Sequence, residues 1–289
     1  MKYKFLIQQA LAEDIGAGDI TSDAIADSKT KAAATIKTKQ DIVLAGMDIA
    51  RDVFLELDSK IKWQALHDDG DFVKKGKIIA MLEGGAAAIL KGERTALNFL
   101  QHLCGIATLT KQFVDAVKGT KAKILDTRKT LPGWRELEKY AVKMGGGANH
   151  RQGLFDRYLI KNNHIDMAGG IAKAIEKVLP LRPFDRLRVS GDKGERGSGQ
   201  KVLIEVEVRN FEELKAALQY PIDIVLLDNF EPEAVRGAMR LAHEKVKFEV
   251  SGGITLDNVA LYAATKVDFI SVGALTHSAP AADIHLCVA

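Results

Sequence analysis

Cysteine is scarce in this sequence, and its scarcity excludes several classes of protein. Only Cys104 and Cys287 occur among 289 residues, too few for a disulfide framework and without the spacing of a metal site. We expect both to be unreactive packing residues in a reducing cytoplasm.

Aromatic residues are also sparse, and long runs of basic or of apolar residues are missing. Aromatics make up 6% of the chain, no five consecutive residues are Lys or Arg, and the net charge is only +3. A nucleic-acid partner is therefore not expected, because such proteins combine a concentrated basic surface with stacking aromatics. No apolar stretch approaches the ~20 residues of a membrane span. Gln8 and Gln9 interrupt the first apolar run, so we expect neither a signal peptide nor a membrane partner.

Several motifs of covalent and metal catalysis are missing as well. The sequence has no Ser-His-Asp order, no HExxH or CxxC motif, no Walker loop and no dinucleotide-binding glycine fingerprint. Neither a covalent nucleophile nor a transition-metal site is expected.

The second half of the chain alternates regularly between apolar strands and amphipathic helices. This alternation predicts a parallel sheet covered by helices, here an α/β barrel or an incomplete one. The strands are expected at intervals of 20 to 24 residues, over 201–208, 223–227, 247–250 and 268–272, with helices over 211–219, 231–243 and 255–264. Two less regular units precede them, a strand over 123–126 with a helix over 134–144, and a strand over 158–160 with a helix over 167–179.

The first part of the chain has a pattern typical of a separate α+β domain. We expect this domain over 1–112, joined by the C-terminal tail 276–289, and the barrel over 113–275. The acidic segment 13–19 lacks calcium-loop spacing and is interpreted as a turn that caps a helix. Residues 182–200, rich in Gly and charge, are expected to form an exposed, mobile loop. The expected helices cover 3–12, 47–57, 86–103 and 107–117, and the strands cover 32–38, 42–44, 61–65 and 77–82.

Positive charge is concentrated in one segment, residues 128–161. Eight Lys and Arg stand there against three acids, an excess of five, whereas the whole chain carries only +3. The cations are interspersed with Gly145, Gly146 and Gly147, which a merely solvated helix face would not need. The segment therefore favours a pocket for a small, highly charged anion.

Two glycine-containing turns follow neighbouring expected strands. Ser251, Gly252 and Gly253 come after one strand, and Gly273 and Ala274 come after the next. Such turns can present backbone N–H groups and a helix N-terminus to a phosphate, as the last two loops of many barrels do. Alternatively they are only tight connections, but their occurrence on adjacent strands favours phosphate binding.

Cations stand at expected strand ends as well. Thr127, Arg128 and Lys129 follow one strand, and Arg can bind a carboxylate with a planar fork while Lys acts as a point charge. His150-Arg151 and Lys161 add positive charge at the same edge. Each cation alone is explained as well by a weak surface pair worth roughly 0–1 kcal/mol. Their joint occurrence around a glycine triplet favours a functional site.

Acids occur inside the expected barrel. Glu205 and Glu207 share one face of an otherwise apolar strand, and Asp228 ends the next strand. Buried acids are costly unless they bind hydroxyls, cations or Mg²⁺. The alternative is a structural ion pair with a barrel lysine. Arg94 lies in an expected helix, and the pattern alone makes it a surface residue.

These motifs together resemble the quinolinate phosphoribosyltransferase family, also described as nicotinate-nucleotide pyrophosphorylases. The resemblance covers nearly the whole chain, and its long central motif is highly specific. It is carried by LAEDIGAGDITS, ERTALNFLQHLCGIAT, DTRKTLPGWRELEKYAVKMGGGANHRQGLFDRYLIKNNH, IEVEV, LLDNF, SGGITLDN and VGALTHS. It implies a glycosyltransferase that joins quinolinate to phosphoribosyl pyrophosphate (PRPP) with decarboxylation, in the de novo biosynthesis of NAD. It also implies a shortened or open α/β barrel of parallel strands plus an N-terminal α+β domain. The protein would be a cytoplasmic homodimer in which each site is completed by the neighbouring subunit.

The resemblance also implies roles for individual residues. Quinolinate would be held by Arg128, His150, Arg151 and Lys161, with Arg94 supplied by the partner subunit. Lys129, Glu207 and Asp228 would bind PRPP and its Mg²⁺, and Glu207 fits the family spacing better than Glu205. The catalytic set would be Arg128, Lys129, Lys161, Glu207 and Asp228. The remaining substrate contacts would come from Thr127, Ser251, Gly252, Gly253, Val272, Gly273 and Ala274.

Two other functions are compatible with parts of this pattern. One is a same-fold paralogue with a different acceptor, such as the molybdenum-utilisation proteins that resemble this family. The intact cationic motif favours quinolinate over that reading, because a new acceptor should change the carboxylate-binding cations. The other is a non-catalytic phosphosugar-binding protein, against which Glu207 and Asp228 argue, since anion binding alone does not need acids.

Overall fold

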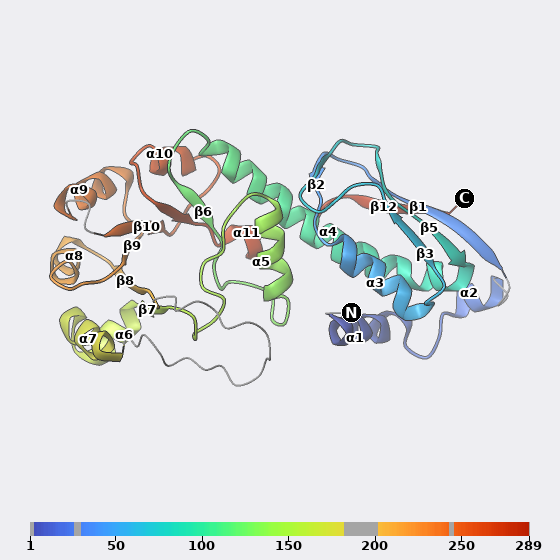
Figure 1. Cartoon of the computed structure of the whole chain (residues 1–289), viewed down its shortest axis with the longest axis horizontal. Coiled ribbons are helices and arrows are strands. Elements are labelled where there is room, and N and C mark those ends of the chain that lie inside the picture. Colours follow the sequence, from blue (N-terminus) through green and yellow to red (C-terminus); the bar gives the residue numbers. More distant parts are fainter. Residues whose placement is uncertain (1–2, 26–29, 182–201, 243–245, 289) are drawn as a thin grey trace. The chain divides into compact units, whose positions relative to one another are not determined.

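The computed structural model describes residues 3–25, 30–181, 202–242 and 246–288 (Figure 1). The loop expected over 182–200 lies outside the described residues. The expected domain boundary, at 112/113, differs from the division found in the structure chiefly in the segment 130–147. Contacts divide the chain into one compact unit of Met1–Gln112, Thr130–Gly147 and Leu275–Ala289 and a second of Phe113–Lys129 and Ala148–Ala274.

An antiparallel sheet of four strands organises the first unit, in the order β12-β1-β5-β3. In β1, Ala34, Ile36 and Thr38 are buried while their neighbours are more exposed, because successive side chains of a strand point to opposite faces. The C-terminal strand β12 and the short strand β4 were not expected from the sequence. The strands are β1 (Lys31–Thr38), β3 (Lys62–Ala65), β5 (Ile78–Gly85) and β12 (Ile284–Val288), with a separate pair of β2 (Ile42–Val43) and β4 (Phe72–Val73).

Helices of the first unit follow the apolar periodicity. Helix α3 buries one stripe, Met47, Ile49, Ala50, Val53 and Phe54, as an amphipathic helix does. The capping role expected for residues 13–19 is confirmed, because Asp19 accepts the N–H groups of Thr21 at 3.1 Å and Ser22 at 3.0 Å. The helices are α1 (Lys4–Ile15), α2 (Ile20–Ile25), α3 (Met47–Leu57) and α5 (Arg135–Met144), together with the first part of α4 (Ala86–Ala116).

Helix α4 corrects one expectation from the sequence. Two helices, over 86–103 and 107–117, were expected, but a single helix of 31 residues runs through Gly105. A glycine inside a helical pattern is easily taken for a helix end. Here a Cβ atom on Gly105 would lie 2.1 Å from the carbonyl oxygen of Pro280, so the glycine permits close packing.

The two cysteines differ in their surroundings. Cys104 is fully buried, and burial raises the pKa of its thiol to about 12, so it is an unreactive packing residue as expected. Cys287 is exposed, and the expectation that it packs in the interior is wrong.

The second unit contains a parallel sheet of six strands in the order β6-β11-β10-β9-β8-β7. The strands β8 and β9 are almost wholly buried, and each fully buried Val, Leu or Ile contributes roughly 1.5–3 kcal/mol to stability. Within the described residues, the edge strands β6 and β7 do not pair with each other, so the barrel is open, as expected. The strands are β6 (Lys123–Leu125), β7 (Tyr158–Ile160), β8 (Ile204–Val208), β9 (Ile224–Asp228), β10 (Lys247–Ser251) and β11 (Phe269–Ser271).

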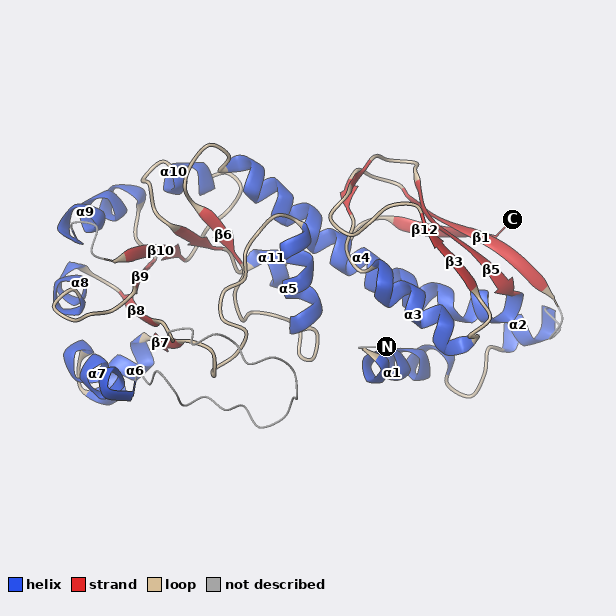
Figure 2. Ribbon diagram, in the orientation of Figure 1, coloured by secondary structure: helices blue, strands red, loops and turns tan. Residues whose placement is uncertain are grey.

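Helices cover the outer side of this sheet (Figure 2). One expectation is wrong: in place of a helix over 167–179, α6 and α7 are separated by Gly169 and Gly170, whose φ values are +80° and +125°. Among the described residues, no helix has both the length and the apolar composition needed to cross a membrane. The elements are α6 (Asn162–Ala168), α7 (Ile171–Val178), the 3-10 turn η1 (Leu179–Leu181), α8 (Phe211–Ala217), α9 (Pro232–Ala242), α10 (Val259–Ala263) and the short α11 (Ala274–His277) at the boundary between the units.

Candidate active site

The polar residues predicted for the site lie mainly at the carboxyl ends of the parallel strands. Since these ends meet at one edge of a parallel sheet, residues distant in sequence are placed there together. The pairing of Ser251 with Asp228 in the β10–β9 register shows this alignment. Arg94 is the exception, an exposed residue of α4 in the first unit. The others are Thr127, Arg128 and Lys129 after β6, His150 and Arg151 before β7, Lys161 after it, Glu207 in β8, Asp228 and Ser251 at the ends of β9 and β10, Gly252 and Gly253 next, and Val272, Gly273 and Ala274 after β11.

An ion pair joins two of these strand ends. Lys161 Nζ lies 3.2 Å from Glu207 Oε2, and the backbone N–H of Asn162 donates to Glu207 Oε1 at 3.3 Å. The Glu207 side chain is 6% exposed, whereas that of Lys161 is 47% exposed. Glu207 is thus held by the loop after β7, while the ammonium group of Lys161 remains accessible to an anion.

Asp228 stands close enough to this pair to be affected by it. Its own burial and the negative charge of Glu207 raise the pKa of Asp228, and Lys161 and Lys129 offset part of the effect. Two acids and two lysines therefore share one electrostatic environment. Carboxylate oxygens are the ligands that Mg²⁺ prefers, and they also accept hydrogen bonds from sugar hydroxyls, so the donor set fits magnesium-bound phosphosugar.

Two arginines gather close to each other at the same edge. Arg151 is buried, and its desolvation together with the positive charge of Arg128 lowers the pKa of Arg151. Arg128 Nε is buried and has no hydrogen-bond partner among the described residues. Neighbouring guanidinium groups with an unused donor are costly in isolation and favourable around a dianion. A carboxylate placed between the two groups would therefore offset their mutual repulsion and accept from the unused donor.

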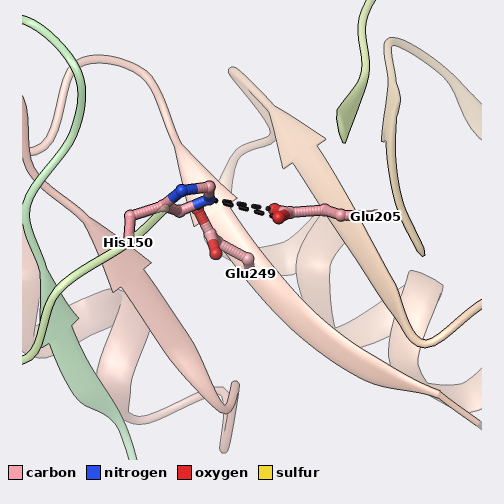
Figure 3. Close-up of side chains that lie close together, drawn as sticks. All are labelled: His150, Glu205 and Glu249. Atoms are coloured by element: carbon pink, nitrogen blue, oxygen red, sulfur yellow. Dashed lines mark hydrogen bonds and ion pairs between the residues drawn. The ribbon is translucent and has the colours of Figure 1, made fainter. Parts of the chain in front are cut away.

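A buried cluster of His150, Glu205 and Glu249 lies inside the barrel (Figure 3). His150 Nε2 lies 3.2 Å from Glu205 Oε2 and 3.5 Å from Glu249 Oε1. Arg157 Nη1 pairs with Glu205 Oε2 at 3.0 Å, and the Ser271 hydroxyl donates to Glu249 Oε1. Glu205 is therefore part of a structural ion network, which leaves Glu207 as the acid of β8 that faces Lys161.

The turn after β10 has the backbone shape that its glycines predict. Gly252 has φ +97°, and a Cβ atom on it would lie 2.1 Å from Asn229 Oδ1. Gly253 has φ +62°, and with Asn229 and Asn258 these glycines line a pocket of about 250 Å³. The helix expected over 255–264 begins only at Val259 and has five residues. If an anion binds here, as predicted, the turn itself rather than the N-terminus of a long helix would supply most of its N–H donors.

Sequence reasoning did not identify Glu249, Arg157 and Ser271 as members of the site. The signal for Glu249 was available, because it is an acid in an apolar strand, as Glu205 and Glu207 are. Arg157 and Ser271 carry no such signal. Their pairing with the two buried acids depends on the register of β7, β8, β10 and β11.

Comparison with known proteins identifies the family. The family model described as "Quinolinate phosphoribosyl transferase, C-terminal domain" matches residues 106–287, and the corresponding N-terminal model matches residues 19–104. The sequence is 40% identical over 288 residues to a protein of Bacillus subtilis named probable nicotinate-nucleotide pyrophosphorylase (carboxylating), covering 100% of this chain and 94% of that one.

Two further relatives agree with this assignment. A Nicotiana glauca protein named quinolinate phosphoribosyltransferase (decarboxylating) 2, mitochondrial, is 38% identical, with 98% of this chain and 81% of that one covered. The solved structure of the nicotinate-nucleotide pyrophosphorylase from Francisella tularensis superposes with a TM-score of 0.88 at 43% identity, covering 98% of this chain and 95% of that one.

Proposed function

The chain belongs to the quinolinate phosphoribosyltransferase family, and from this premise we propose that it is a pentosyltransferase of de novo NAD biosynthesis. It transfers the phosphoribosyl group of PRPP to quinolinate and releases nicotinate mononucleotide, CO₂ and pyrophosphate. The observation that carries this proposal is the adjacent pair Arg128 and Arg151, with the Arg128 Nε donor unused among the described residues. A pyridine with two carboxylates is an anion that such a pair would hold.

Quinolinate would be bound by cations on the loops around β6 and β7. Arg128 and Arg151 hold its two carboxylates through forked hydrogen bonds, and Lys161 adds a mobile point charge. His150, which was expected to bind quinolinate as well, contacts the backbone N–H of Arg151 and the Glu205 carboxylate with its two ring nitrogens. Arg94 would reach the site from the neighbouring subunit of a homodimer, which accounts for its exposure in α4.

PRPP would lie between the acids and the glycine-containing turns. Lys129, Glu207 and Asp228 would hold its ribose and pyrophosphate, with Mg²⁺ bound by the two acids mostly through PRPP and water. Bound Mg²⁺ would neutralise negative charge on the pyrophosphate. The 5′-phosphate would rest on backbone N–H groups of the two turns, with Thr127 contributing a hydroxyl. The turns comprise Ser251, Gly252 and Gly253, and Val272, Gly273 and Ala274.

The reaction follows from holding the two anions in line. The ring nitrogen of quinolinate forms a bond to the anomeric carbon, and the bond from that carbon to pyrophosphate breaks with its electron pair leaving on pyrophosphate. Lys129 stabilises the charge that develops on the leaving group. The resulting pyridinium accepts the electrons of the adjacent carbon–carboxylate bond, so CO₂ departs and a proton from solvent replaces it. No covalent nucleophile is needed.

A direct assay tests the proposal. Purified protein is mixed with quinolinate, PRPP and Mg²⁺, and nicotinate mononucleotide and CO₂ are measured, with nicotinate as an alternative acceptor in a parallel reaction. We expect turnover with quinolinate and none with nicotinate. PRPP binding without turnover of quinolinate would overturn the acceptor and favour the paralogue. Binding of PRPP with no transfer to any pyridine carboxylate would indicate a non-catalytic phosphosugar-binding protein.

We also propose that the protein is located in the cytoplasm.

A further inference from the structure

Glu249 is a fully buried acid near the site, and the proposed reaction does not use it. It lies in the middle of β10 and is 0% exposed. Its Oε1 accepts from the Ser271 hydroxyl and faces His150 Nε2, and its Oε2 has no partner among the described residues. Such a group costs more than an apolar side chain of the same size unless the fold requires its hydrogen bonds.

The His150 ring connects Glu249 to the substrate-binding loop. His150 Nδ1 accepts the backbone N–H of Arg151 at 2.7 Å, so this nitrogen carries no hydrogen and Nε2 is the donor. Nε2 is hydrogen-bonded to Glu205 Oε1 at 3.4 Å and lies 3.5 Å from Glu249 Oε1 (Figure 3). Both ring nitrogens are therefore engaged within the protein. In this arrangement the ring holds the backbone of Arg151. The backbone N–H of His150 itself donates to Asp126 Oδ1 at 2.8 Å.

A metal ion is a weaker explanation for the same three residues. One oxygen of Glu205 is already paired with Arg157 at 3.0 Å, and the Glu249 oxygen that faces His150 accepts from Ser271. A cation placed among them would compete with a guanidinium group. The contacts instead resemble the outer partners that hold a histidine in one tautomer and one orientation.

We propose that Glu249 is a positioning residue for quinolinate recognition, acting through His150 to set the backbone, and hence the guanidinium group, of Arg151. This inference rests on the proposed function. It gives His150 the role of a support beneath the carboxylate pocket rather than that of a direct ligand. Burial and the nearby Glu205 raise the pKa of Glu249 well above its usual range, which supports a neutral carboxylic acid at this position.

The test separates positioning from a merely structural role. E249L keeps the volume and removes the hydrogen bonds, whereas E249Q keeps an uncharged group with both an acceptor and a donor. We expect E249L to raise the KM for quinolinate on the order of 10–100-fold, with the KM for PRPP little changed. E249Q should restore most of the quinolinate affinity. In ¹H–¹⁵N spectra, the backbone amide resonance of Arg151, which reports its hydrogen bond to His150 Nδ1, should stay near its wild-type position in E249Q and shift in E249L.

A matched control exists in the first unit. Glu138 is also 0% exposed and its Oε1 lies 2.8 Å from His102 Nε2. E138Q should change stability without separating the two KM values. If E249L does not fold, S271A replaces it as the test, because this substitution removes the Ser271 hydroxyl that donates to Glu249 Oε1. We expect S271A to raise the KM for quinolinate selectively. Equal changes in both KM values, or an unshifted Arg151 amide resonance in the affected variant, would overturn the proposal. Wild-type protein that fails to turn over quinolinate would instead refute the function on which it rests.

Discussion

The parallel and antiparallel sheets of this protein differ in where they can gather polar side chains. In the parallel sheet all six strands end at the same edge, and every proposed site residue except Arg94 lies at or near that edge or on β8. In the antiparallel sheet, neighbouring strands end at opposite edges. Its charged residues form dispersed surface pairs. In one of them Lys62 Nζ lies 3.3 Å from Glu83 Oε2, and the two side chains are 77% and 63% exposed. Chain direction, more than composition, determines where a site can form.

The largest loss of activity is expected when a cation is removed from the carboxyl-end edge of the parallel sheet. R128A should abolish measurable turnover, a loss of at least about 10²–10³-fold in kcat/KM, because one carboxylate of quinolinate would lose its forked partner. R51A, which removes a half-buried arginine paired with Asp48 at 2.8 Å in the first unit, should leave kcat/KM within about twofold. Steady-state kinetics and circular dichroism measure both. Near-normal kinetics in a folded R128A variant would show that Arg128 does not bind quinolinate, and that this edge of the parallel sheet is not its binding site.

Arg94 is the one proposed contribution of the first unit, and complementation can test it. R94A and R128A should each be inactive alone. When the two variants assemble randomly, half of the dimers are hybrids, and one of the two sites in each hybrid would receive Arg94 and Arg128 intact from different subunits. About a quarter of all sites should therefore regain activity. A mixture of R128A and K129A, both altered after β6, is the control and should stay inactive. Isolated hybrids of R94A and R128A without activity would show that Arg94 does not act across subunits.

A smaller effect is expected from adding one methyl group to a turn. G252A forces a left-handed residue to carry a Cβ atom 2.1 Å from Asn229 Oδ1, which should raise the KM for PRPP and lower the melting temperature. G76A has φ +82° and open space around its Cβ position. The G76A substitution should lower the free energy of unfolding by roughly 1–2 kcal/mol, because alanine is strained at a positive φ, and should leave the kinetics unchanged. Equal kinetic effects of the two substitutions would argue against a phosphate site after β10.

The smallest effect concerns the pH dependence of stability. The pKa of Glu249 is raised in the folded chain, so above its ordinary value of 4.5 the unfolded chain releases a proton that the folded chain retains. Stability contributed by this group is therefore complete at low pH and declines as pH rises. E249Q cannot show this decline, and its stability relative to wild type should increase between pH 5 and pH 7. Thermal unfolding at several pH values checks this, and parallel curves would contradict it.

Much of the second unit was predictable because its signals are local. Alternating apolar strands and helices gave nearly all elements from β8 to β11 within a few residues, and polarity at strand ends indicated the edge that carries the site. The errors arose where a glycine has two uses. Gly105 continues a helix because Pro280 packs against it, while Gly169 and Gly170 end one. A pattern of residue types cannot distinguish these cases, since the difference lies in a distant contact.

The sequence by itself determined the family, the open α/β architecture and the identity of the cations, acids and glycines that form the candidate site. These follow from periodicity, strand-end polarity and a long specific motif, all of which are written along the chain. Only the tertiary structure decided which acid of β8 meets Lys161, that Glu249 supports His150, and that Ser271 and Arg157 satisfy the buried carboxylates. The reason is physical: hydrogen bonds between strands depend on register and side-chain direction, and both are fixed only when the whole sheet packs.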